Sequence, residues 1–147
     1  VYRLNLRCFF WMINFEVRIA PISDAEKIIF DPEIYNRIKI DGIEVKELPT
    51  ENVIYVGGYL DGEIVSLMMY YIRNKYTTCH VHVLKAHRAR LAVKFGRESL
   101  LMRPCNALYT NIPSNFPDVI KFAEHFGFKY IGLVNGQRLY GVNYGFY

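Results

Sequence analysis

The sequence predicts a single α/β domain built on a mixed β-sheet, and two patterns support this fold class. A β-rich hairpin pattern at residues 52–74 is followed by another strand pattern at 76–84, which is typical of an antiparallel meander. Helical and strand patterns then alternate, which favours a sheet that becomes partly parallel. The length of 147 residues favours one domain, and 52% hydrophobic residues suffice for a sizeable core.

The first part of the chain predicts a strand and two helices. Residues 15–21 alternate between apolar and polar and are rich in β-formers, so they form the expected first strand. Ser23 with Glu26 three residues later matches a capping box, so a helix is expected to follow. Pro32 interrupts this helix and starts a second short one, which Asp41-Gly42 ends.

The middle of the chain predicts the hairpin and a long helix. Asp61-Gly62 is a favoured two-residue turn, so the strands on either side of it should pair antiparallel. After residue 84 the period changes, and one buried helical face is indicated by Leu91, Phe95 and Met102. Pro104 ends this helix, and residues 105–112 read as a strand again.

The last part predicts one more helix and a hairpin. Asn115 is the expected N-cap, Pro117 lies in the first turn, and Gly127 is the expected C′ residue. Asn135-Gly136 then marks a turn between two final strands.

Charge and cysteine content narrow the function classes. The net charge of +4 is mild, so nucleic acid is not an expected partner. Between residues 80 and 103, six basic residues stand against the single acid Glu98; this indicates either a solvated helix face or a surface for a polyanion such as a phosphorylated cofactor. The cysteines Cys8, Cys79 and Cys105 are widely spaced, which predicts free thiols, with Cys79 and Cys105 buried in strands, and neither a disulfide framework nor a zinc site.

The N-terminus does not follow the domain pattern. The chain opens on Val1, and its apolar run around residues 8–15 is too short for a membrane span and has no small-residue cleavage site. The regular pattern starts at Met12. We therefore expect residues 1–11 to be an N-terminal extension and residues 12–147 to be the domain.

The segment "IPSNFPDVIKFAEHFGFKYIG" resembles the last helix and strand of the GNAT acyltransferases, in which a helix ends in Gly-Phe before a strand. The predicted order of elements and the placement of "VHVLKAHRARLAVKFGRESL" also match that family, over residues 15–147. The second segment is similar to a subgroup found in bacteriophage genomes. The resemblance implies the GNAT fold: a mixed, mostly antiparallel sheet of about six to seven strands, helices on both faces, and a splayed central strand pair.

The resemblance implies acetyl-CoA (CoA) as cofactor. In the family, the pantetheine arm pairs with the central strand, and the next helix points its N-terminal amides at the pyrophosphate. Here the strand would be Cys79 to Leu84, and the phosphate loop would be Arg88 to Val93. The implied cofactor-binding residues are His82, Val83, Leu84, Arg88, Ala89, Arg90, Leu91, Ala92, Val93, Asn111 and Asn115.

The chain departs from the family in the phosphate loop. Leu91 and Val93 stand where the family has glycines that let phosphate oxygens approach the backbone. Direct contacts from Arg88, Arg90 and Lys94 would compensate in part. Asn111 and Asn115 have an alternative role as a turn residue and an N-cap.

The resemblance places His80 near the family's general base. A histidine with a near-neutral pKa could deprotonate an ammonium group; the alternative is a structural, hydrogen-bonded histidine. A metal site from His80 and His82 is not expected, since no third ligand is spaced to join them. The family's general-acid tyrosine corresponds to Ala123, and the alternatives Tyr109, Tyr130 and Tyr140 are also explained by packing.

Two functions remain open at this point. One is an acetyl-CoA-dependent N-acetyltransferase that acts on a small-molecule or protein amine, in the cytoplasm, or the host cytoplasm if phage-encoded. The other is a catalytically inactive GNAT-fold structural or interaction protein, for example a phage head or virion component. A membrane partner is not expected, and a homodimer is left open.

Overall fold

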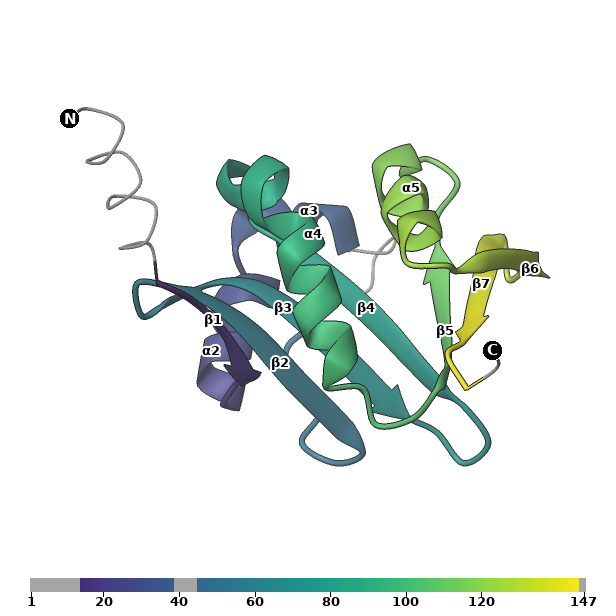
Figure 1. Cartoon of the computed structure of the whole chain (residues 1–147), viewed down its shortest axis with the longest axis horizontal. Helices are drawn as coiled ribbons and strands as arrows, with labels where there is room; N and C mark the ends of the chain where they lie inside the picture. The colour runs from purple at the N-terminus through teal and green to yellow at the C-terminus, as the bar shows by residue number, and fades with distance from the viewer. Residues whose placement is uncertain (1–13, 39–44, 146–147) are drawn as a thin grey trace.

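A computed structural model of the chain describes residues 14–38 and 45–145 (Figure 1). The predicted N-terminal extension at residues 1–11 and the predicted helix end at Asp41-Gly42 lie outside the described residues. No helix in the described ranges is long and apolar enough to cross a membrane.

The described part of the chain forms one seven-stranded sheet with the order β1-β2-β3-β4-β5-β7-β6 (Figure 1). All neighbouring strands are antiparallel except β4 and β5, which are parallel. This confirms the predicted meander and the mixed, mostly antiparallel sheet. The strands are β1 (Phe15–Ile19), β2 (Val53–Leu60), β3 (Glu63–Ile72), β4 (Thr77–Val83), β5 (Ala107–Ile112), β6 (Lys129–Val134) and β7 (Gln137–Asn143).

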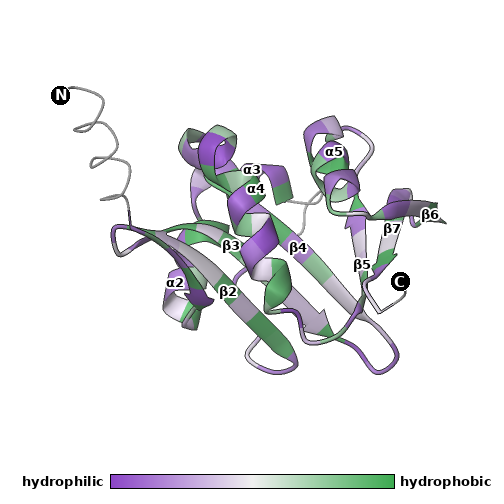
Figure 2. Cartoon of the chain, viewed as in Figure 1, coloured by the Kyte–Doolittle hydropathy of each residue, from purple (hydrophilic) through white to green (hydrophobic). Residues whose placement is uncertain are grey.

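Helices cover both faces of the sheet, as predicted. The helices of the described residues are α2 (Ile22–Ile29), α3 (Pro32–Ile38), α4 (Lys85–Leu101) and α5 (Pro117–His125). One buried cluster joins α4 and α5 to the sheet and includes Tyr70 and Phe95; a second joins α2 and α3 to the opposite face and includes Ile28 and Leu67. Figure 2 shows hydrophilic and hydrophobic stretches along α4. The residues of this helix that are buried are Phe95, Gly96, Ser99 and Leu100.

Both predicted hairpin turns are present. Asp61 and Gly62 have φ values of 49° and 86°, and Asn135 and Gly136 have φ values of 50° and 76°. Two successive residues with positive φ are the mark of a type I′ turn, whose twist matches that of the paired strands. Asp-Gly and Asn-Gly tolerate this backbone, so the sequence signal here was local and sufficient.

Three local predictions are wrong: two of the helix caps and the burial of one thiol. Helix α2 begins at Ile22 because the carbonyl of Pro21 accepts the N–H groups of Asp24 and Ala25, so Ser23 lies inside the first turn and makes no cap. In the same way α5 is capped by the backbone of Phe116, one residue after Asn115. Cys79 is buried in β4 as expected, but Cys105 is exposed because β5 begins only at Ala107.

Gly127 ends α5 as predicted. Its φ is +90°, its N–H donates to Glu124 O (3.0 Å), and the next N–H, of Phe128, donates to Ala123 O (3.1 Å). This pair of bonds is a Schellman motif, which satisfies the last carbonyls of the helix. Phe128 is thereby turned into the core under α4 and α5, which fixes α5 beside the end of β5.

Candidate functional site

The two parallel strands at the centre of the sheet are joined at one end only. β4 and β5 pair through Thr77 with Leu108 and through Thr78 with Tyr109, and the register stops there although both strands continue. Figure 1 shows the strands close together at one end and diverging toward the starts of α4 and α5. The predicted splayed strand pair is therefore present, and we call the gap between its diverging halves the split.

Three predicted site residues share one face of the sheet at the split. His80 lies opposite Met69 and His82 opposite Leu67, and both partners belong to the core under α2 and α3. Asn111 alternates with the residues of β5 that face α4 and α5, so it points to the same side as the histidines. Two residues beyond the last strand pair on each strand, His80 and Asn111 stand opposite each other across the split.

Both histidines are neutral at pH 7. His80 is partly buried, and burial, with a smaller effect of the positive charge of Arg73, lowers its pKa to about 4. Burial also lowers the pKa of His82 to about 3, with smaller effects from His80, Arg37 and Arg88. The expected near-neutral pKa of His80 is thus wrong, because a strand position puts the ring among protein atoms that cannot solvate a charge as water does. The ring of His80 also contacts the edge of Tyr71, with 5.7 Å between centroids.

Asn111 brings an unsatisfied acceptor to the split. Its Oδ1 atom is buried and has no hydrogen-bond partner among the described residues. A buried acceptor of this kind costs stability unless a ligand or water supplies a donor. Sequence reasoning chose Asn111 through the family resemblance, but only the structure shows which of its atoms is available.

Helix α4 starts earlier than expected, so the predicted phosphate loop is not a loop. The helix begins at Lys85, directly after Leu84, and residues 88–93 lie within its first turns. Alanine, leucine, arginine and lysine are strong helix formers, and no glycine or proline interrupts this segment. The backbone N–H groups that an anion could reach at this helix therefore belong to its first turn, from Lys85 onward.

A carboxylate from α3 already lies at the start of α4. Glu33 Oε1 accepts the backbone N–H of Lys85 (2.6 Å) and Nη2 of Arg88 (3.0 Å). Nε of Arg88 also donates to the carbonyl of Val83 at 2.9 Å. Negative charge is stabilised at a helix N-terminus, so the contact is favourable in the free protein. Sequence reasoning missed Glu33, since the two residues that meet are 52 positions apart and give no local signal.

Helix α3 also contacts the other side of the split. Arg37 lies one helical turn after Glu33, and its Nη2 donates to both carboxylate oxygens of Asp118 at 3.2 and 3.1 Å. Its guanidinium lies 4.6 Å from the centre of the Phe116 ring. Burial raises the pKa of Asp118, but the hydrogen bond and charge of Arg37, together with backbone N–H groups, outweigh this and lower it. One short helix thus bridges the starts of α4 and α5.

The other predicted cofactor residues are more dispersed. Val83 is buried at the end of β4, Leu84 is the backbone N-cap of α4, and Asn115 is exposed in the turn before α5. On α4, Ala89, Arg90 and Val93 are exposed, whereas Leu91 and Ala92 are partly buried. Nζ of Lys94 lies 5.7 Å from the centre of the Phe15 ring on β1. β1 is an edge strand, separated from β5 by β2, β3 and β4, so Lys94 points away from the split.

The tyrosine candidates are separated by their positions. Ala123 is only 7% exposed and belongs to the core under α4 and α5, so this position does not open into a cleft. Tyr140 is buried in the same cluster, and Tyr130 is exposed on the edge strand β6. Of the three alternatives, only Tyr109 shares a face with His80 and Asn111, and its ring contacts Tyr76 edge-on at 6.3 Å.

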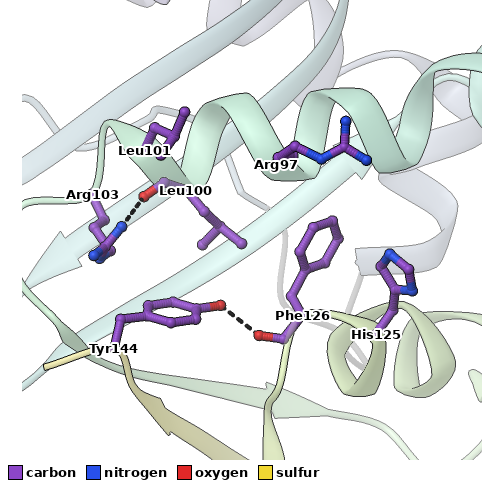
Figure 3. Close-up of a pocket in the computed structure, with 7 residues that line it drawn as sticks. All are labelled: Arg97, Leu100, Leu101, Arg103, His125, Phe126 and Tyr144. Carbon is purple, nitrogen blue, oxygen red and sulfur yellow. Dashed lines mark hydrogen bonds between the residues drawn. The ribbon is translucent and has the colours of Figure 1, made fainter. Parts of the chain in front are cut away.

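A separate shallow hollow of about 380 Å³ lies at the other end of α4 (Figure 3). Two of its polar side chains are hydrogen-bonded: Nη1 of Arg103 donates to Leu100 O, and the Tyr144 hydroxyl donates to Phe126 O at 2.6 Å. The Nε atom of Arg103 is buried and has no partner among the described residues. It lies beside the C-terminal turn of α4, away from the residues around the split. Its lining residues are Arg97, Leu100, Leu101, Arg103, His125, Phe126 and Tyr144.

Comparison with solved structures identifies the architecture. A GNAT-family acetyltransferase from Streptococcus pneumoniae matches with a TM-score of 0.67 at 12% identity, over 88% of this chain and 99% of that one. The chain has the GNAT fold. An N-acetyltransferase from Thermoplasma acidophilum, solved in complex with coenzyme A, matches this GNAT-fold chain with a TM-score of 0.66 at 11% identity, over 89% and 99% of the two chains.

A spermidine N-acetyltransferase chimera from Vibrio cholerae and hSSAT matches with a TM-score of 0.61 at 11% identity, over 88% of this chain and 95% of that one. No protein-family model and no curated protein sequence matches the chain. The GNAT fold is therefore established by the arrangement of the backbone.

Proposed function

We propose that this GNAT-fold protein is an acyltransferase that takes an acetyl group from acetyl-CoA and passes it to an amine. The observation that carries the proposal is the split, where β4 and β5 part after two residue pairs and leave strand edges beside His80 and Asn111. An extended ligand with amide groups can bind such an edge as an added strand does. The acetyltransferases that share the fold support the same reaction class.

The residues at the split fit the pantetheine arm of the cofactor. Oδ1 of Asn111 is a buried acceptor without a partner, and an amide N–H of pantetheine is a donor that would satisfy it. Neutral His80 offers one further donor or acceptor on the facing strand. At the far end, the first turn of α4 and Arg88 suit a diphosphate, but Glu33 holds these same donors.

When bound, acetyl-CoA supplies an activated acetyl thioester. The protein's own part is to orient the acceptor amine and to keep it in its reactive, neutral form. His80 can accept a hydrogen bond from an amine N–H, but an imidazole with a pKa of about 4 does not hold a proton at pH 7. The proton that the amine loses would therefore pass through water to the departing CoA thiolate, and His80 acts as a positioning residue.

Thermal unfolding with acetyl-CoA, and with CoA alone, tests the proposal. A ligand at about 100 times its Kd adds about 2.7 kcal/mol to the stability of the folded state. For a domain of this size that corresponds to a rise in Tm of roughly 5–10 °C. Absence of any rise at millimolar acetyl-CoA would overturn the proposal and leave a structural or interaction role.

The variant Asn111→Leu links this test to the site. It replaces an unsatisfied buried acceptor by an apolar group of similar shape, so the ligand-free protein should be as stable as wild type or more stable. The Kd for acetyl-CoA should rise about tenfold, the effect of one lost hydrogen bond to a buried group. Thr110→Val, on the opposite face of the same strand, is the control and should leave the Kd unchanged.

A further inference from the structure

The contact between Glu33 and the start of α4 has the chemistry of a bound anion. Its Oε1 atom receives a backbone N–H at 2.6 Å and a guanidinium N–H at 3.0 Å. Phosphate oxygens at a helix N-terminus are bound by the same two kinds of donor. A carboxylate and a phosphate both carry negative charge, so they exclude each other from this position.

The contact is accessible and can open without loss of the fold. The side chains of Arg88 and Glu33 are 30% and 37% exposed, so solvent reaches both groups. Helix α3 is held independently by Ile34, which is 2% exposed, and by the ion pair between Arg37 and Asp118. Rotation of the Glu33 side chain alone would release Lys85 N and Arg88.

We infer that Glu33 is an internal competitor for the diphosphate of CoA and sets the selectivity for the acyl donor. The inference rests on the proposed function, because it assumes that a pantetheine arm binds in the split. An acyl donor that contains the pantetheine arm but no phosphate group can bind while Glu33 stays in contact with α4. A donor that carries the diphosphate binds only after Glu33 has left α4, and its affinity is reduced accordingly.

The test measures the Kd of CoA and of pantetheine by calorimetry for wild type and Glu33→Gln. The amide keeps the size of the side chain but removes the negative charge, and circular dichroism checks that the variant is folded. Glu98→Gln is the matched control: it removes the same charge from α4 itself, 13 residues and about 20 Å along the helix from Lys85.

We expect Glu33→Gln to bind CoA about tenfold more tightly than wild type, since the charged hydrogen bonds that must break are lost. Pantetheine should bind both proteins equally within twofold, and Glu98→Gln should behave as wild type. If CoA binds no better to Glu33→Gln, or if pantetheine gains as much as CoA, or if Glu98→Gln gives the same gain, the inference is overturned while the proposed function stands. If neither ligand binds wild type or Glu33→Gln at millimolar concentration, the proposed function itself fails, and the inference fails with it.

Discussion

The low pKa of His80 predicts a loss of stability in mild acid, and His80→Asn tests it. In the unfolded chain a histidine has a pKa near 6.5, whereas in the folded protein that of His80 is about 4. Between these pH values the unfolded chain binds a proton that the folded protein does not bind. The contribution of His80 to the free energy of unfolding is therefore fully present above pH 6.5 and decreases as the pH drops toward 4. Below pH 4 the protonation of His80 lowers the stability no further.

The size of the effect follows from the two pKa values. A difference between 6.5 and about 4 corresponds to about 3 kcal/mol at 1.36 kcal/mol per pKa unit. This is a large share of the roughly 5–15 kcal/mol that stabilises a typical domain. Hydrogen bonds from Tyr59 to Asp24 and from Arg37 to Asp118 lower the pKa of both carboxyl groups below the ordinary range, so the stability they lose in acid is lost at lower pH and does not mask the histidine.

Urea unfolding of wild type and His80→Asn between pH 7 and pH 4 provides the measurement. The asparagine does not titrate, so the wild type should lose about 3 kcal/mol more than the variant over this interval. His82 titrates in both proteins and cancels in the comparison. If the two proteins lose stability in parallel, the ring of His80 is solvated in the folded state, and its assignment as a neutral positioning residue is refuted.

Two further substitutions test how α5 is set against the sheet. Gly127→Ala should lower the free energy of unfolding in urea by about 1–2 kcal/mol, because the alanine is forced to φ +90°; the new Cβ itself has room, since its nearest neighbour, Val142, is 3.7 Å away. The control Gly132→Ala should be neutral, because that Cβ meets no atom and the backbone φ is not positive. Equal losses of stability in the two variants would contradict this reasoning. Ala123→Tyr should lower the stability by about 1–3 kcal/mol, since the position is packed in the core; an unchanged Tm would show instead that it opens into a cleft.

The features that the sequence predicted well depend on local backbone chemistry. The Asp61-Gly62 and Asn135-Gly136 turns and the helix end at Gly127 each require positive φ, and few residues tolerate it. The predicted helix caps failed because a backbone carbonyl can start a helix without a side chain, as Pro21 does for α2.

The properties of the site that were missed arise only from tertiary structure. The contact of Glu33 with α4 joins residues far apart in the chain, and the low pKa of His80 depends on the protein atoms that surround the ring. Oδ1 of Asn111 has no hydrogen-bond partner among the described residues, and the spacing of residues in a sequence cannot reveal this. The family resemblance correctly predicted the splayed strands. The same resemblance placed a loop at residues 88–93, although the strong helix formers there favour the helix that begins at Lys85.

The single-ended joint between β4 and β5 gives the sheet a mechanical property. Five residues of β4, Cys79 to Val83, extend beyond the last pair with β5 as an arm about 16 Å long at 3.3 Å per residue, and this arm stays paired with β3 on its other edge. A rotation of only about 5° at Thr78 then moves the tip of that arm by about 1.4 Å, on the geometry of an extended strand. Such a rotation would leave the ladder bonds of β1–β4 and of β5–β7 intact, but it would have to stretch or break the ion pair between Arg37 and Asp118 that spans the split. The two halves of the sheet would rotate as rigid bodies about a hinge formed by the strand pairs of Thr77 and Thr78.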